Sequence, residues 1–189
     1  MKVFLIGGTG LLGSECAKQL IALGHEVTAL ALPPVPKGAD LPPEMKIEFG
    51  SYLDMSDEEL KRCFEGCEGF VFAAGVDERV EGPAPIYDMF KKFNITPLER
   101  LLRIAKECGV KHTAICGSYF SYFAKIWPEK DLCRWHPYIR SRQINILCYF
   151  LSHKYLCKIL LIAFDCRLKV YQMDSFCEFE NSEYGFCGK

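Results

Sequence analysis

"KVFLIGGTGLLGSECAKQLIALGH", residues 2–25, joins a short apolar run to a helical pattern through a glycine-rich turn. The run at 2–7 is apolar after its first residue and leads into glycine, which predicts a buried strand. From Leu12 to Leu23 apolar residues recur every three to four positions, which predicts a helix that ends at Gly24. A strand, a tight turn and a helix in this order begin an α/β unit.

The turn between them has the pattern of an anion-binding loop. Gly7 lets the chain leave the strand sharply, Gly10 lets the backbone approach a pyrophosphate, and Gly13 lets the helix pack closely on the sheet. The free N–H groups and the positive end of the helix then face the anion. The predicted phosphate-binding residues are Gly7, Gly8, Thr9, Gly10, Leu11, Leu12 and Gly13. The alternative is a glycine-rich turn that binds no ligand.

The same alternation of strand and helix continues through the first three quarters of the chain. Further strands are predicted at 26–32, 46–50, 69–75 and 112–118, and further helices at 56–66, with Ser56 as N-cap, and at 96–110. Apolar strands that alternate with helices are typical of a parallel sheet covered on both faces. The predicted fold class is therefore α/β, a doubly wound parallel sheet.

Several ordered motifs resemble the extended short-chain dehydrogenase/reductase family, the NAD(P)-dependent epimerase/dehydratases. They are the G-x2-G-x2-G spacing of the turn, "FVFAAG" at 70–75, "NITPLERLLRIAKECGVKH" at 94–112 and "CGSYFSY" at 116–122. The resemblance implies a Rossmann-type fold, a nicotinamide dinucleotide cofactor, and dimers built through helices of this region. It also implies that Ser51, Tyr52, Ala73, Ala74 and Asn94 border the cofactor.

The choice between NAD and NADP stays open. An acid at the end of the second strand would bind the adenosine ribose, and an arginine there would suit a 2′-phosphate. Ala31 and Leu32 occupy those places and have neither charge. Lys37 could reach a phosphate, but a single lysine in a proline-rich loop is usually just solvated. Ser51 stands where the family usually has an aspartate that contacts the adenine.

The resemblance also implies a catalytic centre. The family has a tyrosine and a lysine spaced Y-x3-K on one helix, together with a serine or threonine that ends the fifth strand. Here Tyr138 is followed at the fourth position by Arg142, and Ser118 stands at the strand end. Arginine keeps the positive charge that would stabilise a tyrosinate, but it is not equivalent to lysine. The alternatives are an ordinary aromatic at position 138, and hence a catalytically inactive NAD(P)-binding sensor or interaction module.

Composition changes abruptly after Arg142. All ten prolines and thirteen of the fifteen glycines lie in residues 1–142, although turn residues normally occur throughout a domain. We therefore expect an NAD(P)-binding domain at 1–142, with an incomplete sheet, and an atypical tail at 143–189 that lacks the family's substrate-binding region. The tail could be a foreign ending on a truncated, non-functional product. Alternatively, "KILLIAF" at 158–164 could substitute for the sixth strand.

Charge and cysteine content exclude several other classes. The net charge of −1 gives no general attraction to nucleic acid or to anionic membranes. A membrane helix at 144–164 is an alternative that His153, Lys154 and Lys158 disfavour, because they interrupt the apolar run. The apolar stretch 3–6 is too short for a signal peptide or a membrane span, so a cytoplasmic location is expected. Cys63 and Cys67 have no second pair at metal-binding spacing, so no metal is expected. The small-molecule substrate cannot be read from the sequence.

Overall fold

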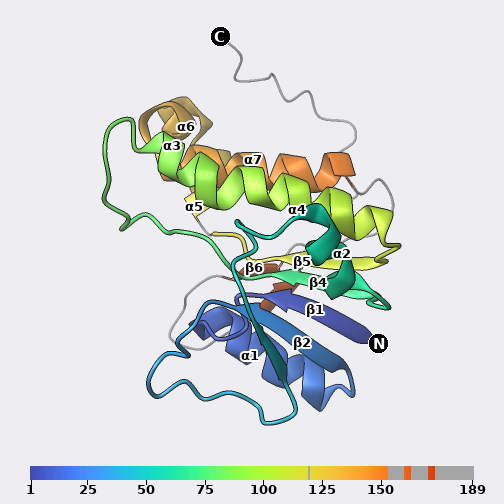
Figure 1. Cartoon of the computed structure of the whole chain (residues 1–189). Coiled ribbons are helices and arrows are strands. Elements are labelled where there is room, and N and C mark those ends of the chain that lie inside the picture. Colours follow the sequence, from blue (N-terminus) through green and yellow to red (C-terminus); the bar gives the residue numbers. More distant parts are fainter. Residues whose placement is uncertain (119, 153–159, 163–169, 173–189) are drawn as a thin grey trace.

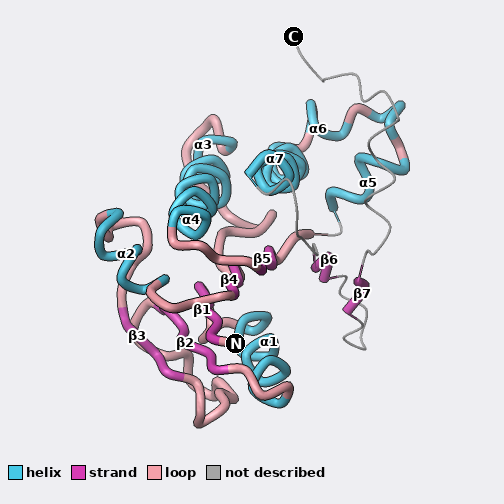
Figure 2. Tube along the Cα trace, turned by 90° about the vertical axis from the view of Figure 1, so that its right-hand side faces the viewer, coloured by secondary structure: helices cyan, strands magenta, loops and turns pink. Residues whose placement is uncertain are grey.

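The computed structural model describes residues 1–118, 120–152, 160–162 and 170–172. Its centre is a five-stranded, all-parallel sheet in the order β3-β2-β1-β4-β5 (Figure 2). The strands are β1 (Lys2–Ile6), β2 (Glu26–Ala31), β3 (Lys46–Phe49), β4 (Gly69–Phe72) and β5 (His112–Ile115). The strand order reverses between β1 and β4, which is the switch point of a Rossmann-type sheet. The predicted fold class is confirmed.

Helices cover both faces of this sheet (Figure 1). The helix α1 (Leu11–Ala22) lies on one face, and α2 (Asp57–Phe64), α4 (Thr96–Glu107) and α7 (Pro137–Ser152) lie on the other. The sequence did not predict α3 (Tyr87–Phe90), the π-helix Lys91–Ile95 that leads into α4, α5 (Phe120–Ile126), the 3₁₀ turn Pro128–Lys130 or α6 (Leu132–Trp135). These short elements form the loops beside the carboxyl ends of β4 and β5.

Alternate residues of β1 enter two separate cores. Val3 and Leu5 pack with Ala17 of α1, whereas Phe4 and Ile6 pack with residues of α2 and α4. Phe4 and Phe64 meet edge to face, with ring centroids 4.8 Å apart. Each fully buried side chain of this size contributes about 1.5–3 kcal/mol relative to exposure. The period-two alternation of β1 thus fastens α1 and the α2–α4 layer to the same strand.

The start of α2 has the predicted cap. The Oγ of Ser56 accepts a hydrogen bond from the backbone N–H of Glu59 at 3.2 Å, and the Glu59 carboxylate accepts one from the Ser56 N–H at 2.7 Å. This reciprocal pair satisfies two N–H groups that the helix leaves free. The helix ends at Phe64, between the two cysteines of the C-x3-C pair. No metal-binding cluster of His, Cys, Asp or Glu occurs in the part of the chain that the structure describes.

The composition break falls inside a helix. The helix α7 runs without interruption from Pro137 across Arg142 to Ser152. The strand β6 (Leu160–Ile162) pairs antiparallel with β7 (Val170–Gln172) in a separate two-stranded sheet. The expectation that this segment supplies a sixth strand of the main sheet is therefore wrong for residues 160–162, and the rest of 158–164 lies outside the described residues. Within the described ranges, no helix is long and apolar enough to cross a membrane.

Candidate functional site

The glycine turn holds α1 against the ends of β1 and β4. Gly7 has a φ of +89°, and a Cβ atom there would lie 2.5 Å from the carbonyl oxygen of Ala73. A Cβ atom on Gly13 would lie 2.1 Å from the carbonyl oxygen of Gly7. Both contacts are too short for any side chain, so the close packing predicted for Gly13 is confirmed. The turn brings the first N–H groups of α1 to the carboxyl edge of the sheet.

The N-terminus of α1 has the chemistry of an anion site. Gly10 is its N-cap and provides no side-chain cap, and the first turn of the helix contains no acidic residue. The N–H groups at the start of the helix therefore have neither a capping side chain nor a neighbouring negative charge in that turn. An anion would be stabilised there by these N–H groups and by the helix dipole.

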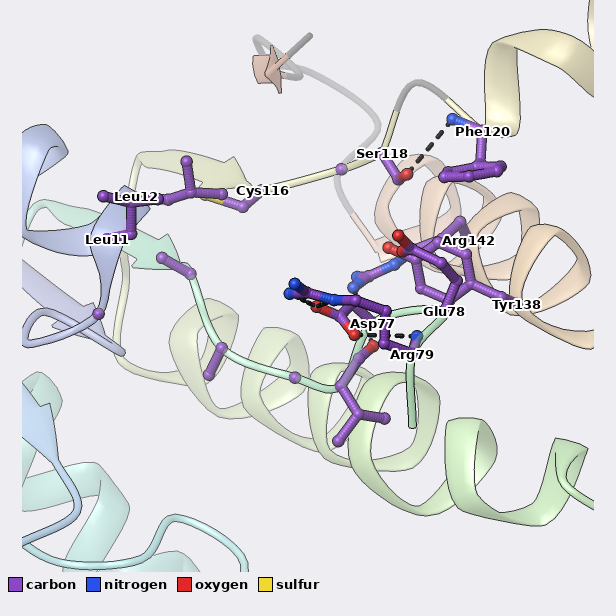
Figure 3. Close-up of a pocket in the computed structure, with 16 residues that line it drawn as sticks. Leu11, Leu12, Asp77, Glu78, Arg79, Cys116, Ser118, Phe120, Tyr138 and Arg142 are labelled. Carbon is purple, nitrogen blue, oxygen red and sulfur yellow. Dashed lines mark hydrogen bonds and ion pairs between the residues drawn. The ribbon is translucent and has the colours of Figure 1, made fainter. Parts of the chain in front are cut away.

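A pocket of about 550 Å³ opens beside this helix end, at the carboxyl edge of β1, β4 and β5 (Figure 3). It is lined by Gly10, Leu11, Leu12, Ala73, Ala74, Gly75, Val76, Asp77, Glu78, Arg79, Cys116, Gly117, Ser118, Phe120, Tyr138 and Arg142. Eight of the predicted site residues are among them: Gly10, Leu11, Leu12, Ala73, Ala74, Ser118, Tyr138 and Arg142. The volume lies in the range of pockets that bind small molecules, about 300–1,000 Å³.

Other predicted site residues lie outside this lining. Gly8 faces the sheet, because a Cβ atom there would lie 2.5 Å from the Cβ of Ala29. Tyr52 packs edge to face on Phe72 with ring centroids 5.8 Å apart, and burial raises the pKa of Tyr52 above its ordinary value. The remaining residues outside the lining are Gly7, Thr9, Gly13, Ser51 and Asn94. Contact of these residues with a cofactor stays a prediction.

Asn94 fixes the loop that follows β4. Its side chain is fully buried and accepts a hydrogen bond from the Val76 N–H at 2.8 Å, while its Nδ2 donates to the Val76 carbonyl at 2.9 Å. Gly75 lies against it with a φ of +128°, where a Cβ atom would be 2.4 Å from Asn94 Oδ1. Arg142 Nη2 also donates to the Val76 carbonyl, at 3.3 Å. Asn94 therefore shapes the wall of the pocket from behind.

The helix α7 presents Tyr138 and Arg142 on one side, as their spacing of four residues requires. Both are buried, and the guanidinium carbon of Arg142 lies 4.9 Å from the centroid of the Tyr138 ring. The rings of Phe90 and Phe120 pack against Tyr138 at 5.5 and 5.7 Å. Arg142 Nε is buried without a hydrogen-bond partner among the described residues. This donor is unusual, because buried polar groups are nearly always paired.

Ser118 reaches the pocket from the loop that follows β5. Its Oγ accepts a hydrogen bond from the backbone N–H of Phe120 at 3.3 Å (Figure 3). The hydroxyl proton of Ser118 is not used in that bond and can be donated to another oxygen. The side chain is buried and lines the same pocket as Tyr138. The structure thus brings the three residues predicted for catalysis to one cavity.

Sequence reasoning missed the charged segment 77–79. Asp77 pairs with Arg79 at the pocket, and hydrogen bonds from Arg79 hold the pKa of Asp77 below its ordinary value, with a smaller effect from Arg142. Burial raises the pKa of the Cys116 thiol to about 12, so Cys116 stays protonated and is a poor nucleophile. The signal that could have found 77–79 is its position in the loop that follows the fourth strand, at the edge where such sheets bind ligands.

Residues 7–142 match a protein-family model described as NAD(P)H-binding. The chain belongs to this NAD(P)H-binding family. The match begins directly after β1 and covers the glycine turn, the strands β2, β3, β4 and β5, and α7 as far as Arg142. No curated protein matches the chain.

Solved structures share the fold of this NAD(P)H-binding chain. A short-chain dehydrogenase/reductase superfamily protein from Agrobacterium tumefaciens with bound NAD has a TM-score of 0.62 at 17% identity, over 87% of this chain and 49% of its own. UDP-glucuronic acid 4-epimerase from Bacillus cereus in complex with NAD has a TM-score of 0.62 at 14% identity, over 86% of this chain and 56% of its own.

MoeE5 in complex with UDP-glucose and NAD gives a TM-score of 0.62 at 16% identity, over 87% of this chain and 54% of its own. The resemblance to the extended short-chain dehydrogenase/reductase fold is thereby confirmed. The chain spans about half the length of the solved structures it matches.

Proposed function

We propose that the pocket binds a nicotinamide dinucleotide, with its pyrophosphate at the N-terminus of α1, and that Ser118, Tyr138 and Arg142 support hydride and proton transfer of the epimerase/dehydratase or reductase type. One observation carries this proposal. Three residues from the end of β5 and from α7 line the same cavity as Gly10 and the α1 N-terminus. This arrangement would hold a reacting group between the dinucleotide and the three side chains.

Each side chain has a defined task in such a reaction. The bound nicotinamide supplies or accepts the hydride. Tyr138 Oη gives or takes the proton of the reacting oxygen, and the positive charge of Arg142 stabilises the tyrosinate. Ser118 Oγ donates a hydrogen bond to the same oxygen as charge develops on it. Phe90 and Phe120 pack on the Tyr138 ring and fix its direction.

The second candidate is a module that binds the dinucleotide without turnover. The contacts of Arg142 favour it, because the guanidinium lies over the face of the Tyr138 ring and bonds the Val76 carbonyl. A guanidinium held in this way is rigid and forked, whereas a lysine ammonium is a mobile point charge. Both candidates assume a cofactor-binding domain at 1–142 and a tail at 143–189. Both also keep the proposals of a cytoplasmic location and of homodimers.

The test separates binding from turnover. Calorimetric titration with NADH and NADPH measures binding to the full chain. Turnover is assayed with NAD+ or NADP+ and UDP-glucose or UDP-glucuronic acid, ligands of the structural neighbours: nicotinamide absorbance reports net oxidation of the sugar, and chromatography of the sugar nucleotides reports epimerisation or dehydration, which leave the cofactor unchanged overall. Tyr138→Phe should keep cofactor affinity and lose about 10²–10⁴-fold in turnover, the usual contribution of a general acid or base. Tyr122→Phe, a change at an exposed tyrosine outside the pocket lining, is the matched control.

Three outcomes are informative. Turnover that depends on Tyr138 supports the first candidate. Binding by the wild-type chain without any such turnover supports the second. Failure of the wild-type chain to bind either cofactor while it melts cooperatively would refute both.

A further inference from the structure

Four exposed apolar residues end or follow the strands β1, β2 and β3, on the side of the sheet where the carboxyl ends of the strands lie. Leu11 begins α1 and is 72% exposed, Leu32 directly follows β2 and is 61% exposed, and Phe49 ends β3 and is 57% exposed. Leu53, in the loop after β3, is also exposed. We call these four residues the apolar shelf. Four of the ten exposed large hydrophobic residues of the described chain belong to it.

The shelf continues from the pocket. Leu11 belongs to both, because it also lines the cavity beside the α1 N-terminus. The strands β2 and β3 end at the same level, since Ala31 is in register with Phe49 and the Gly50 N–H donates to the Ala31 carbonyl at 3.0 Å. In this fold a dinucleotide extends along the carboxyl ends of the strands from the switch point. If its pyrophosphate lies at α1, as in the proposed function, its adenosine end lies over β2 and β3.

No charged side chain occupies the position at the end of β2 that selects between the two dinucleotides. A carboxylate there hydrogen-bonds the ribose 2′-hydroxyl of NAD, and an arginine accommodates the 2′-phosphate of NADP. Leu32 can do neither. In the following loop, Asp40 is engaged by Lys18 at 2.7 Å. Glu44 lines a separate cavity, together with His25 and its neighbours at the amino end of β2.

We propose that the adenosine end of the cofactor site is this apolar shelf, which accepts the ribose with or without its 2′-phosphate, so that the chain binds NAD(H) and NADP(H) with comparable affinity. This inference rests on the proposed function of the pocket. Adenine is flat and uncharged at neutral pH, and it packs on apolar side chains regardless of the ribose substituent. One charge-assisted hydrogen bond at the ribose is worth about ten- to a hundredfold in affinity. The shelf lacks this source of selectivity.

The experiment compares the dissociation constants of NADH and NADPH for the full chain by calorimetric titration. The two constants should agree to within about tenfold, less than one such hydrogen bond provides. A wild-type preference of more than about tenfold for either cofactor would overturn the inference while leaving the proposed binding function intact. For example, recruitment of Lys37 by the 2′-phosphate would give a preference for NADPH. Loss of binding to both cofactors would remove the proposed function, and this inference with it.

Substitution at the shelf supplies a second, independent readout. Leu32→Asp should shift the ratio of the two constants by about tenfold or more toward NADH, because the carboxylate bonds the 2′-hydroxyl and repels the 2′-phosphate. Leu32→Arg should shift it by a similar factor toward NADPH. Leu23→Asp is the matched control, since Leu23 is also an exposed leucine but lies at the C-cap of α1, and it should leave the ratio unchanged. Equal ratios in all four proteins would show that Leu32 does not contact the adenosine end.

Discussion

Replacing Gly13 with alanine tests how the first helix is held at the cofactor site. The added Cβ atom would lie 2.1 Å from the Gly7 carbonyl oxygen, 2.7 Å from the Gly7 carbonyl carbon and 2.9 Å from the Gly8 Cα. All three neighbours are backbone atoms, so no side-chain rotation relieves the contact. Cβ atoms essentially never approach other atoms closer than 3.0 Å, which means that α1 must move by about 1 Å away from β1.

The expected cost follows from two opposing terms. Forcing an extra carbon into a packed region costs about 1–3 kcal/mol, and a purely backbone contact belongs at the upper end. Alanine is a better helix former than glycine by about 1 kcal/mol. The net loss in the free energy of unfolding is about 2 kcal/mol, which lowers the Tm of a chain of this size by about 4–8 °C. The same shift moves the α1 N–H groups and should weaken NADH binding.

Thermal melts and NADH titrations of Gly13→Ala measure both effects. Gly82→Ala is the matched control, because Gly82 lies outside the pocket lining and its Cβ atom would meet only the side chains of Met89, at 3.3 Å, and Ile86, at 3.5 Å. That control should melt within a few degrees of the wild-type chain and bind NADH equally well. If Gly13→Ala melted with the control and kept its NADH affinity, the contact between α1 and β1 would not be what positions the helix end.

Two further predictions concern Asn94, behind the pocket, and Asp57, at the start of α2. Asn94→Ala removes the partner of the Val76 N–H and one of the two donors to the Val76 carbonyl, which keeps its hydrogen bond from Arg142. The unpaired N–H should cost about 1–3 kcal/mol of stability and weaken NADH binding. If the Tm and the NADH affinity both stayed at wild-type values, Asn94 would not hold this loop. Hydrogen bonds from Arg103 and Arg100 lower the pKa of Asp57 in the folded chain below its ordinary 3.8. The contribution of these ion pairs to the stability of the fold is therefore present above about pH 4, and it is lost as the pH falls through the lower folded-state pKa. The Tm of Asp57→Asn should therefore lie below that of the wild-type chain at pH 7 and converge with it toward pH 2, and a Tm difference that is constant across this range would contradict the assignment.

The local sequence pattern was sufficient to predict the five strands of the sheet and three of the helices that cover it. The five strands and the helices α1, α2 and α4 were predicted because each has an apolar period or a cap that neighbouring residues specify, such as Ser56 with Glu59. The segments 76–95 and 119–135 have no such period, and their helices are short. They are stabilised by contacts distant in sequence, such as that of Asn94 with Val76, which no local pattern encodes.

The features of the candidate site also fall into two groups, those that the sequence determined and those that the tertiary structure decided. The sequence by itself determined the glycine turn, the α/β class and the absence of a charged residue at Leu32, because each depends on residue type within a few positions. Only the tertiary structure decided that Ser118, Tyr138 and Arg142 share one cavity with Gly10, that Arg142 lies over the Tyr138 ring, and that Leu11 and Leu32 are both exposed. The physical reason is that parallel strands bring their carboxyl ends to one edge, where residues far apart in sequence meet.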